Sequence, residues 1–148
     1  MRRPLRYPAL AGLIALAACG SPARDVLTLP NAPTSTVALG TDFTLAPGES
    51  VLIDGAGTSL TFVGVAADSR CPSLPQLRCI WAGSARVTLR ATGSAGERAF
   101  ALESVVGDDT ASVGRTIVTL RAVAPARLTL DSIPSASYRS TLQVTHKE

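Results

Sequence analysis

Only a few side chains of this sequence could perform acid–base, nucleophilic or metal chemistry, and their positions argue against it. His146 is the only histidine and stands two residues from the C-terminus, where chains commonly fray. We therefore expect neither a histidine-based catalytic triad nor a histidine metal site. Asp108 and Asp109 could bind Ca²⁺, but adjacent carboxylates in a polar loop are usually just solvated. The sequence predicts no catalytic residue, no cofactor and no metal ion.

The N-terminus has the pattern of an export signal. Three arginines lie in the first six residues, and the apolar stretch at positions 8–18 that follows is too short to span a bilayer. Leu-Ala-Ala-Cys at positions 16–19 resembles the lipobox of bacterial lipoproteins. The resemblance implies that residues 1–18 are a signal peptide and that Cys19 carries the acyl chains of a membrane anchor. The alternative is an ordinary signal peptide that happens to end near a cysteine.

The same resemblance implies a location, and composition and length indicate the layout of the chain that follows. Gly20 is not the aspartate that retains lipoproteins in the inner membrane, so we expect the outer membrane, facing the periplasm. Residues 19–36 are rich in Pro, Ala, Ser and Thr and are expected to form a tether. Residues 37–148 are expected to form one folded domain, because their length suffices for a single core.

The charge of the chain excludes one class of partner. Three of the 14 basic residues precede the expected cleavage site, so that 11 basic and 11 acidic residues remain beyond it. The high isoelectric point therefore belongs to the leader. Nucleic-acid binding requires a basic surface on the folded part, and we expect none.

The cysteine count agrees with lipidation. Three cysteines are an odd number for an exported protein. If Cys19 is acylated, Cys71 and Cys79 remain as a pair in an oxidising compartment, and we expect a disulfide between them. Closing so small a loop contributes about 2–3 kcal/mol on the chain-entropy model. A metal site would need further ligands nearby, and the sequence has none there.

Hydrophobic residues in the domain alternate with a period of two. The clearest case is Ala85, Val87, Leu89 and Ala91, which alternate with polar residues and predict a half-buried antiparallel strand. Together with Gly, Pro and Asp turns, the pattern predicts an all-β fold, a single antiparallel β-sandwich of the immunoglobulin-like type or a small barrel. The expected strands cover residues 41–45, 51–53, 60–66, 80–91, 98–103, 115–123, 127–130 and 137–145.

The most distinctive segment surrounds the cysteine pair. Asp-Ser-Arg-Cys-Pro at positions 68–72 and Cys-Ile-Trp-Ala-Gly at positions 79–83 resemble a group of small bacterial secreted proteins and lipoproteins with the same motif before a strand. Weaker similarity extends from about Phe43 to Val144 and includes a last strand centred on Tyr138. That group has no assigned activity, so the resemblance implies a fold and no catalytic residue.

Each residue of the motif also has a structural interpretation. Asp68 and Ser69 can bond to following main-chain amides and start a turn. Arg70 can pair with Asp68 or with a carboxylate on the next strand. Trp81 would cover the disulfide-bonded turn with apolar area, and Gly83 would permit a bulge.

These observations favour a lipid-anchored, non-catalytic module of the cell envelope that binds a protein or glycan or has a structural role. Arg70 and Trp81 are the candidate residues of its ligand or partner surface. An alternative is a protease-inhibitor-like protein, because the proline-containing loop from Cys71 to Cys79 is closed by the expected disulfide, and rigid loops lose little entropy on docking. A hydrolase would require a pocket with convergent polar groups.

Overall fold

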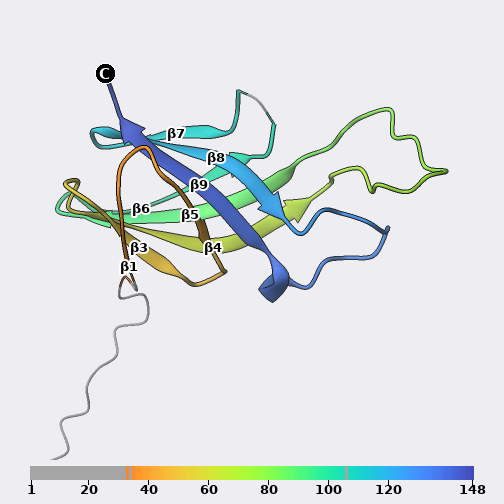
Figure 1. The fold of residues 1–148 in the computed structure, drawn as a ribbon, viewed down its shortest axis with the longest axis horizontal. Helices are drawn as coiled ribbons and strands as arrows, with labels where there is room; N and C mark the ends of the chain where they lie inside the picture. The colour runs from red at the N-terminus through yellow and green to blue at the C-terminus, as the bar shows by residue number, and fades with distance from the viewer. Residues whose placement is uncertain (1–32, 34, 106) are drawn as a thin grey trace, which may run out of the picture.

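Strands make up almost all of the regular structure in the computed structural model, which describes residues 33, 35–105 and 107–148 (Figure 1). They form two separate sheets rather than a closed barrel, which confirms the predicted β-sandwich. The first sheet has the strand order β1-β3-β4-β5-β6, with β1 (Ser35–Val37), β3 (Ser50–Ile53), β4 (Thr58–Asp68), β5 (Ala85–Gly93) and β6 (Gly96–Glu103).

The second sheet has four strands in the order β2-β9-β8-β7. Neighbouring strands in the two sheets run antiparallel, except that β1 pairs with β3 in parallel. A short 3-10 helix, η1, precedes the last strand. The bounds of these elements are β2 (Asp42–Leu45), β7 (Thr110–Val113), β8 (Thr116–Ala124), η1 (Ser135–Ser137) and β9 (Arg139–His146).

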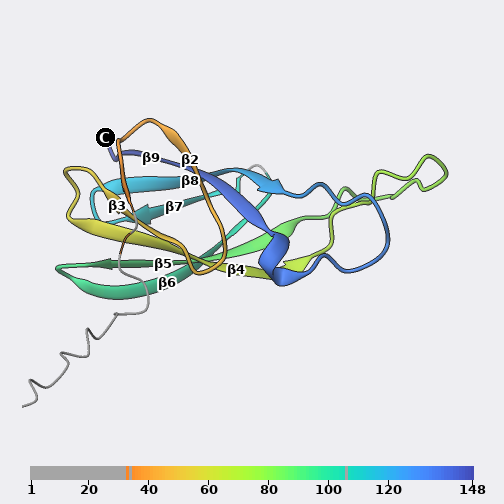
Figure 2. The ribbon, with the colours of Figure 1, turned by 60° about the horizontal axis from the view of Figure 1, so that its bottom comes forward.

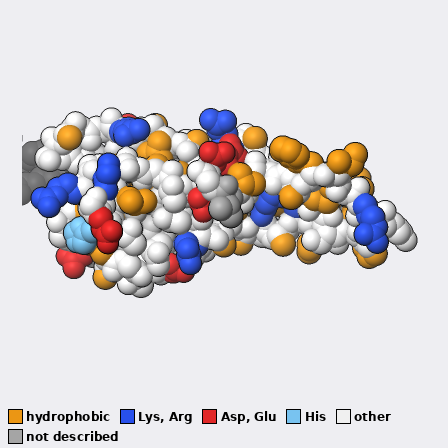
Figure 3. Space-filling model, turned by 90° about the horizontal axis from the view of Figure 1, so that it is seen from above, with side chains coloured by type: hydrophobic (Ala, Val, Ile, Leu, Met, Phe, Trp, Pro, Cys, Tyr) orange, Lys and Arg blue, Asp and Glu red, His pale blue; other side chains and the backbone are white. Residues whose placement is uncertain are grey.

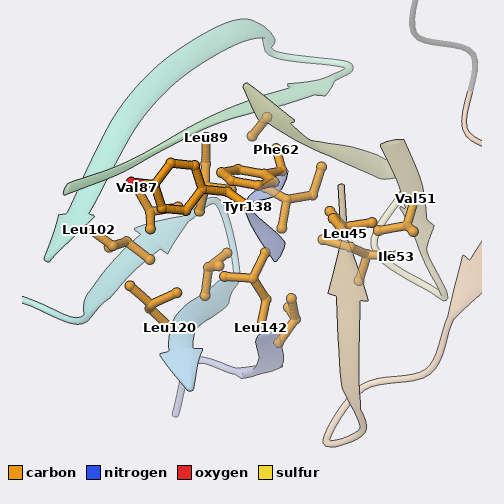
Figure 4. Packing of buried hydrophobic residues seen from close by; sticks show 14 residues of the cluster. Leu45, Val51, Ile53, Phe62, Val87, Leu89, Leu102, Leu120, Tyr138 and Leu142 are labelled. Atoms are coloured by element: carbon orange, nitrogen blue, oxygen red, sulfur yellow. The ribbon is translucent and has the colours of Figure 1, made fainter. Parts of the chain in front are cut away.

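The core lies between the two sheets (Figures 2 and 4). In β5 the four alternating apolar residues predicted to face inward are all buried, because successive side chains of a strand point to opposite faces. The core is mainly aliphatic, and Phe62 and Tyr138 add two aromatic rings. Its buried members are Leu45, Val51, Ile53, Leu60, Phe62, Val87, Leu89, Ala91, Leu102, Val118, Leu120, Tyr138, Leu142 and Val144.

The structure departs from the predicted strands mainly in three places. The strand expected from residue 80 begins at Ala85, because residues 80–84 belong to the disulfide-bonded loop. Residues 127–130 form no strand, since the Arg127 side chain turns back onto main-chain carbonyls, including that of Leu130. Conversely, β7 begins at Thr110, at the end of the stretch expected to be a polar loop, and pairs with β8 through a hairpin turn.

The described chain begins close to the predicted boundary between tether and domain. Ser35 and Thr36, which we assigned to the tether, pair with Val51 and Leu52 of β3. The predicted signal peptide (residues 1–18), the predicted lipidation site Cys19 and the tether up to residue 32 lie outside the described residues. Among the residues that the structure describes, no helix is long and apolar enough to cross a membrane.

Candidate functional site at the disulfide-bonded end

Two long loops extend from one end of the sandwich (Figures 1 and 2). Residues 69–84 connect β4 to β5, and residues 125–134 connect β8 to η1. We call these two loops together the protruding end. The N–H of Ser73 in the first loop donates to the carbonyl of Arg127 in the second, at 2.9 Å. The motif of positions 68–83 thus forms most of this end.

Asp68 and Arg70 form a bidentate ion pair at the base of the first loop. Arg70 Nε donates to Asp68 Oδ1 at 2.9 Å, and Arg70 Nη2 donates to Asp68 Oδ2 at 2.7 Å. The main-chain N–H of Arg70 also donates to Asp68 Oδ1, at 3.1 Å. These bonds confirm the first of the two partners that we considered for Arg70, and they fix the turn that leaves β4.

The same two side chains join the two sheets. Arg70 Nη1 donates to the carbonyl of Val123 in β8 at 2.7 Å, and Arg70 Nη2 donates to the carbonyl of Pro125 at 3.0 Å. The hydroxyl of Tyr138, just before β9, donates to Asp68 Oδ2 at 3.0 Å. A carboxylate at the end of the first sheet therefore receives bonds from the loop that follows its own strand and from the residue just before β9 of the second sheet.

The protonation equilibria of this cluster follow from its contacts. The hydrogen bond from Arg70 is the main reason that the pKa of Asp68 is lowered, and it outweighs the opposing effect of burial. Burial raises the pKa of Tyr138, and its bond to Asp68 raises it further. Asp68 is thus held as a carboxylate and Tyr138 as a neutral phenol, which suits a structural cluster.

Arg127 completes the attachment of the two loops, although no sequence pattern pointed to it. Its Nη1 donates to the carbonyls of Asp68 at 2.9 Å and Arg70 at 3.3 Å. Its Nη2 donates to the carbonyl of Leu130 at 3.2 Å. One guanidinium therefore bonds to carbonyls at the end of β4 and in both loops.

The predicted disulfide between Cys71 and Cys79 is present. Within it, the N–H of Leu77 donates to the carbonyl of Leu74 at 3.1 Å and closes a turn. The N–H of Cys71 donates to the carbonyl of Ala82 at 2.8 Å, so the two limbs of the loop are also bonded to each other below the disulfide.

Gly83 has a steric role and not the predicted one. Its φ is +69°, and a Cβ added there would overlap the carbonyl group of Ser69, whose carbon would lie 2.5 Å away. A side chain would therefore separate the limbs of the loop. The irregular pairings of β4 and β5 lie between Phe62 and Gly64 and between Val65 and Ala67, so the bulge expected at Gly83 is not there.

Trp81 does not cover the disulfide-bonded turn as we expected. Its side chain is 80% exposed, and its neighbour Ile80 is fully exposed. Arg70, the other candidate for a partner surface, is turned inward, with a side chain only 17% exposed. The structure thus separates the two candidates, because Arg70 holds the loop in place and Trp81 is presented to the outside.

The second loop adds two further exposed leucines that the sequence analysis did not select. Leu128 is 63% exposed and Leu130 is 69% exposed. Figure 3 shows apolar side chains gathered along the protruding part of the molecule, with a basic group near its tip. Large apolar side chains clustered on an exposed surface mark interaction sites more often than chance scatter does.

Two arginines of β5 have carboxylate partners on β6, and the only histidine of the chain is exposed. Arg86 pairs with Glu103 at 3.6 Å, and Arg90 pairs with Glu97 at 3.3 Å. His146 is exposed at the end of β9. In the described ranges, no three His, Cys, Asp or Glu side chains gather in a way that could hold a metal ion.

Two surface hollows are lined by residues outside the two loops. One of about 620 Å³ lies at the β5–β6 and β7–β8 hairpins and includes Arg98, Arg115 and His146 in its lining. The other, of about 510 Å³, is lined mainly by small and apolar residues of β4 and η1, among them Val63 and Ala136.

Comparison of the chain with protein families, with curated proteins and with solved structures finds no match.

Proposed function

We propose that this chain is a lipid-anchored protein of the bacterial cell envelope whose β-sandwich is a non-catalytic binding module. The lipobox-like sequence that ends at Cys19 supports the anchor. The observation that carries the binding role is the exposure of Ile80, Trp81, Leu128 and Leu130 on one rigidly attached end of the domain. Large apolar side chains exposed on one end of a domain are typical of an interaction site.

The layout of the domain suits this role. β1, where the described chain enters the sandwich, lies toward the end opposite the protruding end (Figure 1). A tether leading to β1 would therefore leave the protruding end free. Because the disulfide and the Arg70 and Arg127 bonds fix the loops beforehand, little conformational entropy is lost when they dock.

Site-specific photocrosslinking in living cells tests the contact. A photoreactive amino acid at position 81 or 130 is expected to give crosslinked products, because both side chains face outward. The matched control is the same amino acid at Ser94, an exposed residue in the β5–β6 turn at the other end. Equal crosslinking at all three positions, or none at any, would contradict the assignment of the contact surface.

Protease inhibition is a second candidate, and one observation favours it. The run Arg78–Trp81 is exposed, and within the described residues no hydrogen bond joins its main chain to the rest of the domain. Such a segment could bind along the substrate cleft of a protease, with the Arg78 side chain in the specificity pocket. A panel of serine proteases tests this: competitive inhibition that Arg78→Ala abolishes would support it, and simple cleavage after Arg78 would refute it.

A further inference from the structure

We infer that the protruding end inserts its apolar side chains into the headgroup region of an anionic phospholipid bilayer. The inference rests on the proposed function, because it names what that end contacts. The side chains concerned are Ile80 and Trp81 on the first loop and Leu128 and Leu130 on the second.

The shape of the end favours a deformable acceptor. The two loops extend beyond both sheets, and Figure 3 shows apolar side chains along the upper and lower edges of the protruding part in that view. A projection of this kind needs either a cavity of matching shape or a medium that closes around it. A bilayer interface is such a medium. Tryptophan is enriched there because its indole combines an apolar ring with a polar N–H.

The charges of the first loop suit an anionic surface. Between Ser69 and Ser84 the only charged residues are Arg70, which is paired with Asp68, and Arg78, which is exposed. No carboxylate lies in this stretch to repel lipid phosphates. Arg78 is close in sequence to Ile80 and Trp81, so it would reach the phosphates while those side chains enter between the headgroups. In the second loop, Asp131 follows Leu130, and Arg127 is bonded internally.

The proposed anchor makes a shallow insertion sufficient. A protein fixed to a bilayer through Cys19 experiences a high effective concentration of lipid, so that weak contacts are populated. The chain from Cys19 to β1 reaches at most about 50 Å when extended, which allows the domain to lie along the membrane. Four exposed apolar side chains and one cation then add a second attachment to the first.

Trp81 reports on this contact directly, because it is the only tryptophan of the chain. The lipidated protein is reconstituted into detergent-free vesicles of two kinds. One kind is anionic, made of phosphatidylethanolamine and phosphatidylglycerol, and the other is zwitterionic, made of phosphatidylcholine. The tryptophan fluorescence of the two samples is compared. We expect a blue-shifted emission, quenching by brominated lipids and protection from aqueous acrylamide in the anionic vesicles. An emission typical of a fully hydrated indole, with unchanged acrylamide quenching, would overturn the inference.

Variants separate insertion from mere proximity. Ile80→Ser combined with Leu130→Ser is expected to remove at least half of the quenching by brominated lipids, and Arg78→Ser to remove the difference between the two lipid compositions. Val63→Ser, on an exposed apolar residue of β4 that belongs to neither loop, is the matched control and should change neither. The substituted side chains are exposed, so cooperative unfolding should be retained and can be checked for each variant.

The two proposals fail in distinguishable ways. Crosslinks from position 81 to a protein, without any quenching by brominated lipids, would overturn the bilayer inference and leave the binding role standing. Absence of both the crosslinks and the quenching would overturn both. Quenching that persists unchanged in the Ile80→Ser and Leu130→Ser variant would show that the anchor alone holds the domain at the surface, and would also overturn the inference.

Discussion

Arg70→Ala removes the side chain that ties the protruding end to the sandwich. The substitution eliminates two bonds to Asp68, at 2.9 and 2.7 Å, and the bonds to the carbonyls of Val123 and Pro125, at 2.7 and 3.0 Å. Breaking a buried ion pair by removing one partner typically costs about 3–5 kcal/mol. The side chains of this pair are 17% and 9% exposed, so water replaces part of the loss. We expect a decrease of about 3 kcal/mol in the free energy of unfolding near neutral pH.

The loss of stability in Arg70→Ala depends on pH, and its direction follows from the pKa of Asp68. Because Arg70 lowers the pKa of Asp68 in the folded protein, the pair contributes stability above the unfolded value of about 3.9 and loses it as the pH falls through the folded pKa. The difference between wild type and Arg70→Ala should therefore be largest above about pH 5 and decrease in more acidic solution. The remainder, about 1–2 kcal/mol, is the cost of the unpaired carbonyls of Val123 and Pro125.

The assay is denaturant unfolding of wild type, Arg70→Ala and Arg70→Lys over a series of pH values. Arg70→Lys keeps the charge but cannot make the fork of parallel bonds, so an intermediate loss is expected. Equal midpoints for wild type and Arg70→Ala near neutral pH would refute the role of the ion pair. A difference that stays constant through the acidic range would refute the assignment of that role to Asp68.

Other substitutions test separate parts of the account. Replacing both Cys71 and Cys79 by serine should lower the free energy of unfolding by about 2–4 kcal/mol, measured against the oxidised protein, and equal midpoints would contradict a structural disulfide. Gly83→Ala should destabilise the fold by at least about 2 kcal/mol more than Gly55→Ala, since both glycines have nearly the same positive φ but only the first would clash with main chain, and equal losses would argue against the clash. Cys19→Ser should abolish labelling by a palmitate analogue, and a still-labelled protein would remove the lipobox interpretation. A gel shift at physiological salt should show no binding of DNA or RNA, because the chain beyond the predicted signal peptide has as many acidic as basic residues.

Features encoded by local patterns could be predicted from the sequence. The alternation from Ala85 to Ala91 predicted which face of β5 is buried, because a period of two has one physical interpretation in a two-layer fold. The pairing of Asp68 with Arg70, two residues apart, was likewise within reach of local reasoning. The disulfide between Cys71 and Cys79 was predicted in a different way, because assigning Cys19 to lipidation left the other two cysteines as a pair.

Features that depend on contacts between distant residues could not be predicted from the sequence. Arg127 bonds to the carbonyl of Asp68, 59 positions away, and Tyr138 bonds to the Asp68 carboxylate, 70 positions away. Neither partner carries a local signal, since an arginine in a loop and a tyrosine before a strand are both common. Trp81 was expected to cover the disulfide-bonded turn, and only the structure of the loop shows that its side chain is exposed instead.

The protruding end is held in place although four of its large apolar side chains are exposed, so its support and its exposed surface are made by different residues. Elsewhere in the domain, the core between the sheets both stabilises the fold and fixes the positions of the strands. In the loops, position comes from the disulfide, the Asp68–Arg70 pair and the Arg127 bonds, whereas Ile80, Trp81, Leu128 and Leu130 contribute almost no packing. Substitutions of these four side chains should therefore alter binding with little effect on folding. A contact surface arranged in this way can change its target while its support remains the same.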